Sequence, residues 1–200
     1  MQKNSPKKGH LEVICGPMFS GKSEELIRRL RRAKIAQQNI ICFSPAIDTR
    51  TPSSKIASHN GTYIEAITVD NPLTIPTLVT DAISVVGIDE IQFFSNDIVQ
   101  VVLDLIDRGK YVIATGLNLD FRAMPFSNLP AFLALADTIT KLSAICVLCG
   151  SDAYFSQRIV DGKPARYDDP IIKPGAQEAY QARCRSCHIV EGKPAWQKTL

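Results

Sequence analysis

The 200-residue sequence contains no run of about 18 apolar residues, the length that a membrane-spanning helix requires. The N-terminus lacks the apolar stretch of a secretory signal, and the chain has no internal repeat or low-complexity tract. Neither sign of charge dominates, because 23 Lys and Arg stand against 20 Asp and Glu. These absences argue against a membrane protein and a secreted protein, and they predict a cytoplasmic chain without a membrane partner.

The composition is that of an ordinary globular protein, with 45% hydrophobic and 22% charged residues. Two hundred residues favour one sizeable domain with room for a small appendage. Residues 1–10 contain three lysines beside Asn, Ser and Pro, which indicates a flexible, solvated tail rather than an arm for nucleic acid. In a reducing compartment the six cysteines are not expected to form a disulfide framework.

Strand-like apolar runs alternate with amphipathic, helix-like segments before residue 146. The strand-like runs are 10–16, 40–45, 84–90, 111–117 and 138–146, and the helix-like segments are 22–39, 96–109 and 128–137. Strands separated by helices form βαβ units, so we expect an α/β fold with a mostly parallel sheet flanked by helices on both faces. The polar stretch from Asp48 to about Tyr63 is expected to be an exposed loop. From Cys146 onward the chain is rich in turns, which indicates a small appended domain.

The stretch GPMFSGKS at residues 16–23 has the pattern of a phosphate-binding loop. Gly16 and Gly21 let the backbone curl so that N–H groups point inward, Lys22 can reach the β- and γ-phosphates, and Ser23 can offer its hydroxyl to Mg²⁺. The loop lies between a predicted strand and a predicted helix, whose N-terminal partial positive charge adds to the attraction for phosphate. The sequence therefore predicts a nucleotide-binding domain.

Two carboxylates, Asp89 and Glu90, follow the strand-like run that includes VVGI. In a parallel sheet that position is the carboxyl edge, beside the phosphate loop, where ligands bind. Adjacent residues on an extended chain point in opposite directions, so we expect the two side chains to have separate roles. Asp89 is predicted to face Mg²⁺, and Glu90 is predicted to face the acceptor of a transferred phosphoryl group.

Four cysteines form two C-x-x-C pairs, CVLC at 146–149 and CRSC at 184–187. Four thiolates suit tetrahedral Zn²⁺, and a site with four protein ligands is structural because it has no open position. The predicted zinc ligands are Cys146, Cys149, Cys184 and Cys187. The stretch CRSCH also fits a c-type haem attachment pattern, and a single pair could be a redox dithiol, but neither alternative accounts for both pairs. His188 is predicted to be a bystander, and Cys15 and Cys42 are predicted to be small buried apolar residues.

Several motifs occur together and in one order along the chain. They are GPMFSGKS, DTR at 48–50, GIDEIQFF at 87–94, LNLDFRAMPF at 117–126, the two cysteine pairs, and PIIKPGAQEAYQARCRSC at 170–187. From about Leu11 to His188 the sequence resembles the zinc-containing, cytosolic (type II) thymidine kinase family. The resemblance implies a P-loop NTPase-like, RecA-like sheet and a small C-terminal zinc ribbon that carries a lasso loop.

The resemblance also implies an activity, which is transfer of the γ-phosphoryl group of ATP to the 5′-hydroxyl of thymidine, and of deoxyuridine, with Mg²⁺. Glu90 matches the general base of the family. The implied ATP-binding residues are Gly16, Pro17, Met18, Phe19, Ser20, Gly21, Lys22, Ser23, Asp48, Arg50, Asp89, Glu90, Ile91 and Gln92, and two of these, Ser23 and Asp89, are the implied magnesium ligands.

The implied nucleoside pocket has two parts. Its walls match Met18, Phe93, Leu117 and Phe121, and its cover is a lasso that would bind the base largely through main-chain groups. The lasso residues are Ile171, Ile172, Lys173, Pro174 and Gly175, together with Tyr180. Pro174 would remove one backbone donor from such a lasso. The zinc ion would anchor both ends of this segment.

The family resemblance further implies a homotetramer and inhibition by dTTP, the end product of the pathway. We therefore expect four segments along the chain. They are a flexible tail over 1–10, a nucleotide-binding domain over 11–145, a zinc-binding domain with the lasso over 146–192, and a C-terminal tail over 193–200.

Two other functions would use the same phosphate loop. One is a nucleic-acid-dependent ATPase whose zinc ribbon grips DNA, and the other is a non-catalytic nucleotide-binding regulator. A ribbon that grips DNA should be basic, but residues 151–183 carry five Lys and Arg against five Asp and Glu. The sequence therefore favours the kinase and predicts no nucleic-acid partner.

Overall fold

The computed structural model describes residues 9–46, 55–57, 63–172 and 179–194. Several predicted site residues lie outside these ranges, namely Asp48, Arg50, Lys173, Pro174 and Gly175. Most of the two predicted tails also lies outside them. No helix within the described ranges is both long and apolar enough to cross a membrane.

The centre of the fold is a six-stranded sheet in which every described pair of neighbouring strands is parallel. The strand order is β5-β2-β6-β7-β1-β8. These strands are β1 (His10–Cys15), β2 (Ile40–Pro45), β5 (Ile67–Val69), β6 (Val85–Ile88), β7 (Tyr111–Gly116) and β8 (Thr138–Lys141). Parallel neighbours require crossover connections, and the predicted helices supply most of them. The predicted fold class is confirmed.

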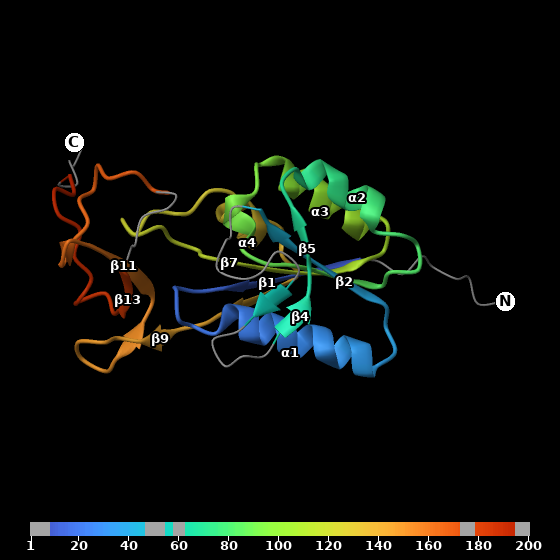
Figure 1. The fold of residues 1–200 in the computed structure, drawn as a ribbon, viewed down its shortest axis with the longest axis horizontal. Helices are drawn as coiled ribbons and strands as arrows, with labels where there is room; N and C mark the ends of the chain where they lie inside the picture. Colours follow the sequence, from blue (N-terminus) through green and yellow to red (C-terminus); the bar gives the residue numbers. More distant parts are fainter. Residues whose placement is uncertain (1–8, 47–54, 58–62, 173–178, 195–200) are drawn as a thin grey trace.

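Helices cover both faces of this sheet (Figure 1). One face packs against α1 (Lys22–Ile35) and the other against α3 (Asp97–Asp107), α2 (Ile75–Leu78) and α4 (Leu129–Leu135). Successive residues of β1 alternate between the faces, because Leu11 and Val13 belong to the larger core cluster and Ile14 belongs to the cluster under α1.

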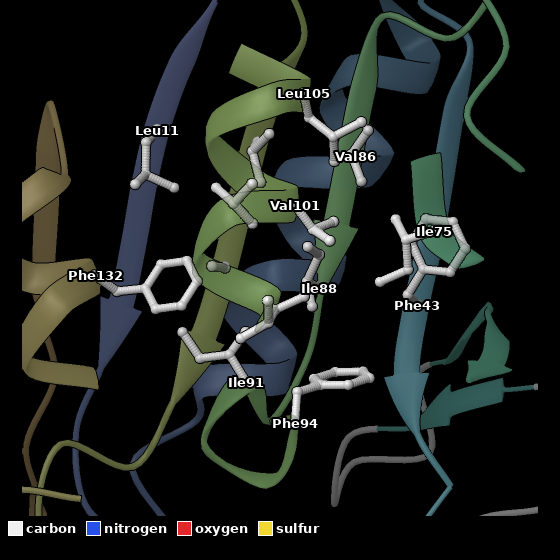
Figure 2. Packing of buried hydrophobic residues seen from close by; sticks show 14 of the residues in the cluster. Leu11, Phe43, Ile75, Val86, Ile88, Ile91, Phe94, Val101, Leu105 and Phe132 are labelled. Carbon is white, nitrogen blue, oxygen red and sulfur yellow. The ribbon is translucent and has the colours of Figure 1, made fainter. Parts of the chain in front are cut away.

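The larger core cluster lies between the sheet and the helices α3 and α4, and Figure 2 shows its packing. Strand residues such as Val86 and Ile88 meet Val101 and Leu105 of α3, and all four are nearly inaccessible to solvent. Ile91, which directly follows the predicted carboxylate pair, is buried in the same cluster. The segment with the two carboxylates is therefore fixed by the core on its C-terminal side.

Lys110 is a buried cation that stabilises the turns between α2 and β6. Its Nζ atom donates to the carbonyl oxygens of Ile83 at 2.7 Å and of Thr80 and Asp81 at 3.1 Å. We expect Lys110→Met to lower the free energy of unfolding by about 1.5–3 kcal/mol, because three carbonyl groups lose a charged donor. Denaturant titration measures this loss. Lys34→Met, which removes an exposed lysine from α1, should change the stability little, and an equal loss would contradict the role of Lys110.

The C-terminal ribbon, residues 144–172 and 179–194, lies at one end of the parallel sheet (Figure 1). It contains a short antiparallel pair, β9 (Ala144–Ile145) with β10 (Asp152–Ala153), and an antiparallel sheet in the order β12-β11-β13. The strands of that sheet are β11 (Phe155–Val160), β12 (Lys163–Pro164) and β13 (Ala179–Arg183). Two more short strands, β3 (Lys55–Ala57) and β4 (Tyr63–Glu65), form a separate antiparallel pair, and the 3-10 helices are η1 (Pro72–Thr74) and η2 (Ile91–Phe93).

Candidate functional site

The predicted phosphate loop connects the carboxyl end of β1 to the first turn of α1. A Cβ atom on Gly16 would lie 2.6 Å from the carbonyl oxygen of Leu142, so this approach of two backbones needs a residue without a side chain. Gly21 has φ 80° directly before α1, a left-handed conformation that glycine adopts without strain. The two glycines therefore allow the sharp turn that brings backbone N–H groups to the start of a helix.

Lys22 and Ser23 are the first two residues of α1, and both side chains are held at the loop. The Lys22 side chain is buried, and its Nζ atom donates to the carbonyl oxygen of Pro17 at 2.8 Å. The Ser23 hydroxyl donates to Oδ2 of Asp89 at 3.0 Å. The partial positive charge of the helix N-terminus acts at the same place. A cation, a helix end and a serine–aspartate pair thus lie together at the phosphate loop.

Asp89 directly follows β6 and is almost fully buried, with 4% of its surface exposed. Besides the Ser23 hydroxyl, its carboxylate accepts hydrogen bonds from the hydroxyl of Thr115 and, at 3.0 Å, from the backbone N–H of Glu90. Three donors fix the orientation of this carboxylate. The position beside Ser23 is suited to a divalent cation, because both side chains offer the hard oxygen ligands that Mg²⁺ prefers.

Glu90 has different neighbours from Asp89. Its backbone is left-handed at φ 49° and ψ 48°, a conformation that is uncommon for a residue other than glycine and that clusters at active sites. Its carboxylate accepts a hydrogen bond from the side-chain amide of Gln92, whose Oε1 atom accepts from the backbone N–H of Leu117 at 3.1 Å. The Asp89 carboxylate is thus hydrogen-bonded to the phosphate loop. The Glu90 carboxylate is linked through Gln92 to the loop that follows β7.

The loop after β7 carries the predicted aromatic residue Phe121, which is 3% exposed. The carboxylate of Asp120 shapes this loop, because it accepts hydrogen bonds from the backbone N–H groups of Arg122 and Met124 at 2.9 and 3.0 Å. The other predicted wall residues are less buried. Phe93 is half-buried and lies edge-on to Phe126 with ring centroids 6.0 Å apart, and Met18 and Leu117 are also half-buried.

The ribbon turns one face of its antiparallel sheet toward both of these loops. On β11, Ser156 Oγ accepts a hydrogen bond from the backbone N–H of Met18 at 2.9 Å, and the guanidinium of Arg158 lies 5.1 Å from the centroid of the Phe121 ring. Tyr180 of β13 is directly opposite Arg158 in the register, so its side chain is on the same face. Two of the six predicted cover residues, Ile171 and Ile172, are 38% and 42% exposed, and three lie outside the described ranges.

Three residues of this region were missed by the sequence analysis. Thr115 holds Asp89, Ser156 holds Met18, and the Asn128 side chain donates to two backbone carbonyl groups in the segment that contains η2, at 2.9 and 3.2 Å. Thr115 could have been suspected, since it is a polar residue in a run of buried apolar ones. Ser156 and Asn128 carry no such signal, because their partners are distant in the sequence.

The four ribbon cysteines come together as the sequence predicted. Their sulfur atoms all lie within 4.8 Å of one another, and Sγ of Cys149 is 3.6 Å from Sγ of Cys184. Tetrahedral Zn²⁺ with Zn–S bonds of about 2.3 Å would separate its sulfur ligands by roughly 3.8 Å, so the donor set and the spacing both fit zinc. Four clustered sulfur atoms could therefore hold one metal ion at the junction of the two C-x-x-C turns.

The thiols of this cluster also differ in acidity. Backbone hydrogen bonds, chiefly from Cys184, lower the pKa of the Cys146 thiol to about 6, whereas hydrogen bonds with the side chains of Cys184 and Cys149 raise the pKa of Cys187 to about 12. Some thiols of the set thus ionise readily, and the Cys187 thiol resists ionisation because its hydrogen bonds to Cys184 and Cys149 favour the neutral form. A divalent cation at the centre would favour the thiolate form of all four, since thiolates are the form that binds zinc.

His188 is not part of the cysteine cluster, as the sequence predicted. Its Nε2 atom lies 3.0 Å from the carbonyl oxygen of Phe121, and its ring stacks on Phe155 with centroids 5.0 Å apart. Because a carbonyl oxygen only accepts, Nε2 must carry the hydrogen atom. Burial lowers the pKa of His188, which favours this neutral form. The second C-x-x-C turn is therefore joined to the loop after β7.

Comparison with known protein families gives a match that covers most of the chain. The family model described as thymidine kinase matches residues 9–188. The matched range contains the phosphate loop, the two carboxylates after β6, the loop after β7 and all four ribbon cysteines. The chain belongs to the thymidine kinase family.

Proposed function

We propose that this protein transfers the γ-phosphoryl group of ATP to the 5′-hydroxyl group of thymidine, and of deoxyuridine, to give the nucleoside monophosphate. The observation that carries the proposal is the pair of adjacent, buried carboxylates with separate partners. Asp89 is tied to Ser23 of the phosphate loop, and Glu90 is tied through Gln92 to Leu117 in the loop after β7. One carboxylate thus serves the donor side and the other serves the acceptor side. Membership of the thymidine kinase family supports the choice of substrates.

The donor side is built from the residues of the phosphate loop. Backbone N–H groups of residues 16–23 and the ammonium of Lys22 would hold the phosphates of ATP, and Ser23 with Asp89 would hold Mg²⁺. Bound Mg²⁺ neutralises charge on the β- and γ-phosphates. The Lys22 ammonium donates to the Pro17 carbonyl oxygen, which places it inside the loop. Ile91, Gln92, Asp48 and Arg50 complete the proposed ATP site.

The acceptor side depends on Glu90. Its carboxylate would take the proton of the 5′-hydroxyl as the oxygen attacks the γ-phosphorus, and ADP would leave on the opposite side. Gln92 orients this carboxylate, because its amide donates to Glu90 while its oxygen is held by the Leu117 N–H. Burial of Glu90 at 4% exposure keeps bulk water away from the proton that moves.

The nucleoside base would lie between the loop after β7 and the ribbon. Phe121, Met18, Phe93 and Leu117 would form apolar walls. The cover would come from the segment that contains Ile171 and Ile172, with the three lasso residues outside the described ranges, and from Tyr180 on the face of the ribbon that contacts Met18 and Phe121. Zinc held by the four ribbon cysteines would fix the two ends of this cover.

The division of the chain follows the same assignment. We propose a nucleotide-binding domain over 11–145 and a zinc-binding domain over 146–192, flanked by the tails 1–10 and 193–200. Inhibition by dTTP is proposed because its triphosphate and its base would compete for the two halves of one site. A homotetramer in the cytoplasm is proposed from the family resemblance, and light scattering of the purified protein tests the number of subunits.

A panel of nucleosides tests the proposed function. With Mg·ATP, thymidine should be converted to its monophosphate, and deoxycytidine should be a far poorer acceptor, because buried polar groups matched to one base are left unpaired by another. Separation of the products by chromatography measures both rates. Equal use of the two nucleosides would show that the pocket is wrongly assigned. ATP hydrolysis that single-stranded DNA stimulates and nucleosides do not would favour the alternative, a nucleic-acid-dependent ATPase.

A further inference from the structure

Arg158 is a buried arginine that the proposed reaction does not use. It has 1% of its surface exposed and is among the largest fully buried side chains in the described ranges. It lies on β11, the central strand of the antiparallel sheet. Its own carbonyl oxygen accepts hydrogen bonds from the Ala165 N–H at 3.0 Å and from the Gln157 amide at 3.1 Å. These hydrogen bonds therefore fix the backbone from which the Arg158 side chain extends.

Among the described residues, the guanidinium of Arg158 has neighbours of two kinds. Its Nη1 atom donates to the carbonyl oxygen of Pro170 at 2.5 Å, and its carbon lies 5.1 Å from the centroid of the Phe121 ring. A guanidinium is flat and weakly hydrated, so it can stack on a ring with its face and donate with its edge. Burial of a charge is unfavourable unless such partners compensate for it. Arg158 therefore needs both neighbours in place.

The two neighbours belong to different parts of the chain. Phe121 is on the loop after β7, which is part of the nucleotide-binding half, and Pro170 directly precedes the exposed residues Ile171 and Ile172 of the ribbon. His188 holds the same loop from a second side, through the carbonyl oxygen of Phe121 at 3.0 Å. Arg158 contacts the ring of Phe121 rather than its backbone, so this arginine contributes to the orientation of the ring.

We infer that Arg158 is a positioning residue for nucleoside binding, which fixes the Phe121 ring and the Pro170 end of the covering segment relative to each other. The distance between these two elements sets the width of the space open to a pyrimidine base. The inference rests on the proposed function, because it assumes that the base binds between Phe121 and the described residues Ile171 and Ile172 that follow Pro170. It adds a residue that is not among the walls or the cover proposed above.

Steady-state kinetics of Arg158→Met tests the inference. This change keeps the apolar stem and removes the flat cation, so the KM for thymidine should rise at least tenfold, while the KM for ATP stays within twofold and kcat falls less than the KM rises. Arg158→Lys keeps the charge but loses the planar face, and it should recover only part of the affinity. An unchanged KM for thymidine in Arg158→Met, or full recovery in Arg158→Lys, would overturn the inference.

A double-mutant cycle separates positioning from a general loss of structure. If Arg158 acts through Phe121, then Arg158→Lys combined with Phe121→Leu should raise the KM for thymidine no more than the stronger single change does. Multiplying effects would contradict the inference, and this cycle remains available if Arg158→Met fails to fold. Arg185→Met is the matched control, because Arg185 stacks on Phe155 at 4.9 Å in the same ribbon and should leave both KM values unchanged.

The outcomes distinguish the two proposals. If the unchanged protein forms no thymidine monophosphate, the proposed function fails and the role of Arg158 fails with it. If the unchanged protein is active and Arg158→Met raises both KM values equally, or raises neither, only the role of Arg158 fails. Zinc content and the thermal unfolding midpoint of each variant show whether the ribbon has folded.

Discussion

Replacing Glu90 by glutamine should reduce the rate of thymidine phosphorylation by about 10²–10⁴-fold, the usual contribution of a general base. The affinity for ATP should stay near normal, because the contacts of Lys22, Ser23 and Asp89 at the phosphate loop are untouched. The neutral amide can accept the hydrogen bond from Gln92 that the carboxylate accepts, so the local fold should survive. Turnover on thymidine and calorimetric titration with ATP measure the two effects.

The matched variant for this test is Asp89→Asn, at the neighbouring position. It removes the charge that holds the Ser23 and Thr115 hydroxyls, so it should weaken the use of Mg·ATP, with a higher KM for ATP. Glu90→Gln should leave that KM unchanged. If Glu90→Gln retains full activity, Glu90 is not the base. A non-catalytic nucleotide-binding regulator would show no turnover on thymidine, either with Glu90 or with glutamine in its place.

Removing the metal from the ribbon should abolish thymidine phosphorylation. Strong chelation is expected to release about one zinc ion per chain, and nucleoside binding should be lost before ATP binding. The reason is that Cys184 follows β13 and Cys146 follows β9, so a metal ion held by these cysteines would tie together the strands beside the covering segment. Metal analysis measures the zinc that is released. Titrations with nucleoside and with ATP measure the two affinities. Activity that survives complete removal of zinc would contradict the anchoring role.

Two cysteine variants serve as a matched pair for the metal test. Cys184→Ser should lower the zinc content well below one per chain and reproduce the effect of chelation. Cys42→Ala removes a buried thiol of β2 outside the cluster and should keep one zinc per chain. Equal zinc content in the two variants would show that the ion binds elsewhere.

The parallel sheet and the phosphate loop could be predicted because their signals are local. The run from 40 to 45 became β2 with the same bounds, and Leu26, Ile27 and Leu30 form the buried side of α1. The predicted strand 138–146 is instead two strands, β8 and β9. The Leu142 N–H donates to the Cys15 carbonyl oxygen at 2.8 Å, and the parallel pairing with β1 ends there. Beyond this point the chain continues into the ribbon.

Other features could not be predicted, because they depend on contacts between distant parts of the chain. The polar stretch that was expected to be an exposed loop up to Tyr63 contains β3, and its last residue begins β4. Ile56, in β3, is buried against the α1 side of the sheet. Ser156 meets Met18 across 138 positions, and Arg158 meets Phe121. In the sequence, Ser156 and Arg158 are only alternate residues of a strand. Their contacts depend on where the ribbon packs against the rest of the chain.

Burial also raises the pKa of Cys15 and of Cys42, and both thiols are shielded by the packed sheet. A thiol reagent added to the folded protein at neutral pH should therefore leave these two sulfurs unmodified, because the thiolate is the reactive form. Alkylation would then have two well-separated phases. In the early phase the four ribbon cysteines would react as the ribbon opens. In the late phase Cys15 and Cys42 would react as the sheet denatures. A single thiol reagent would therefore distinguish loss of the ion from global unfolding.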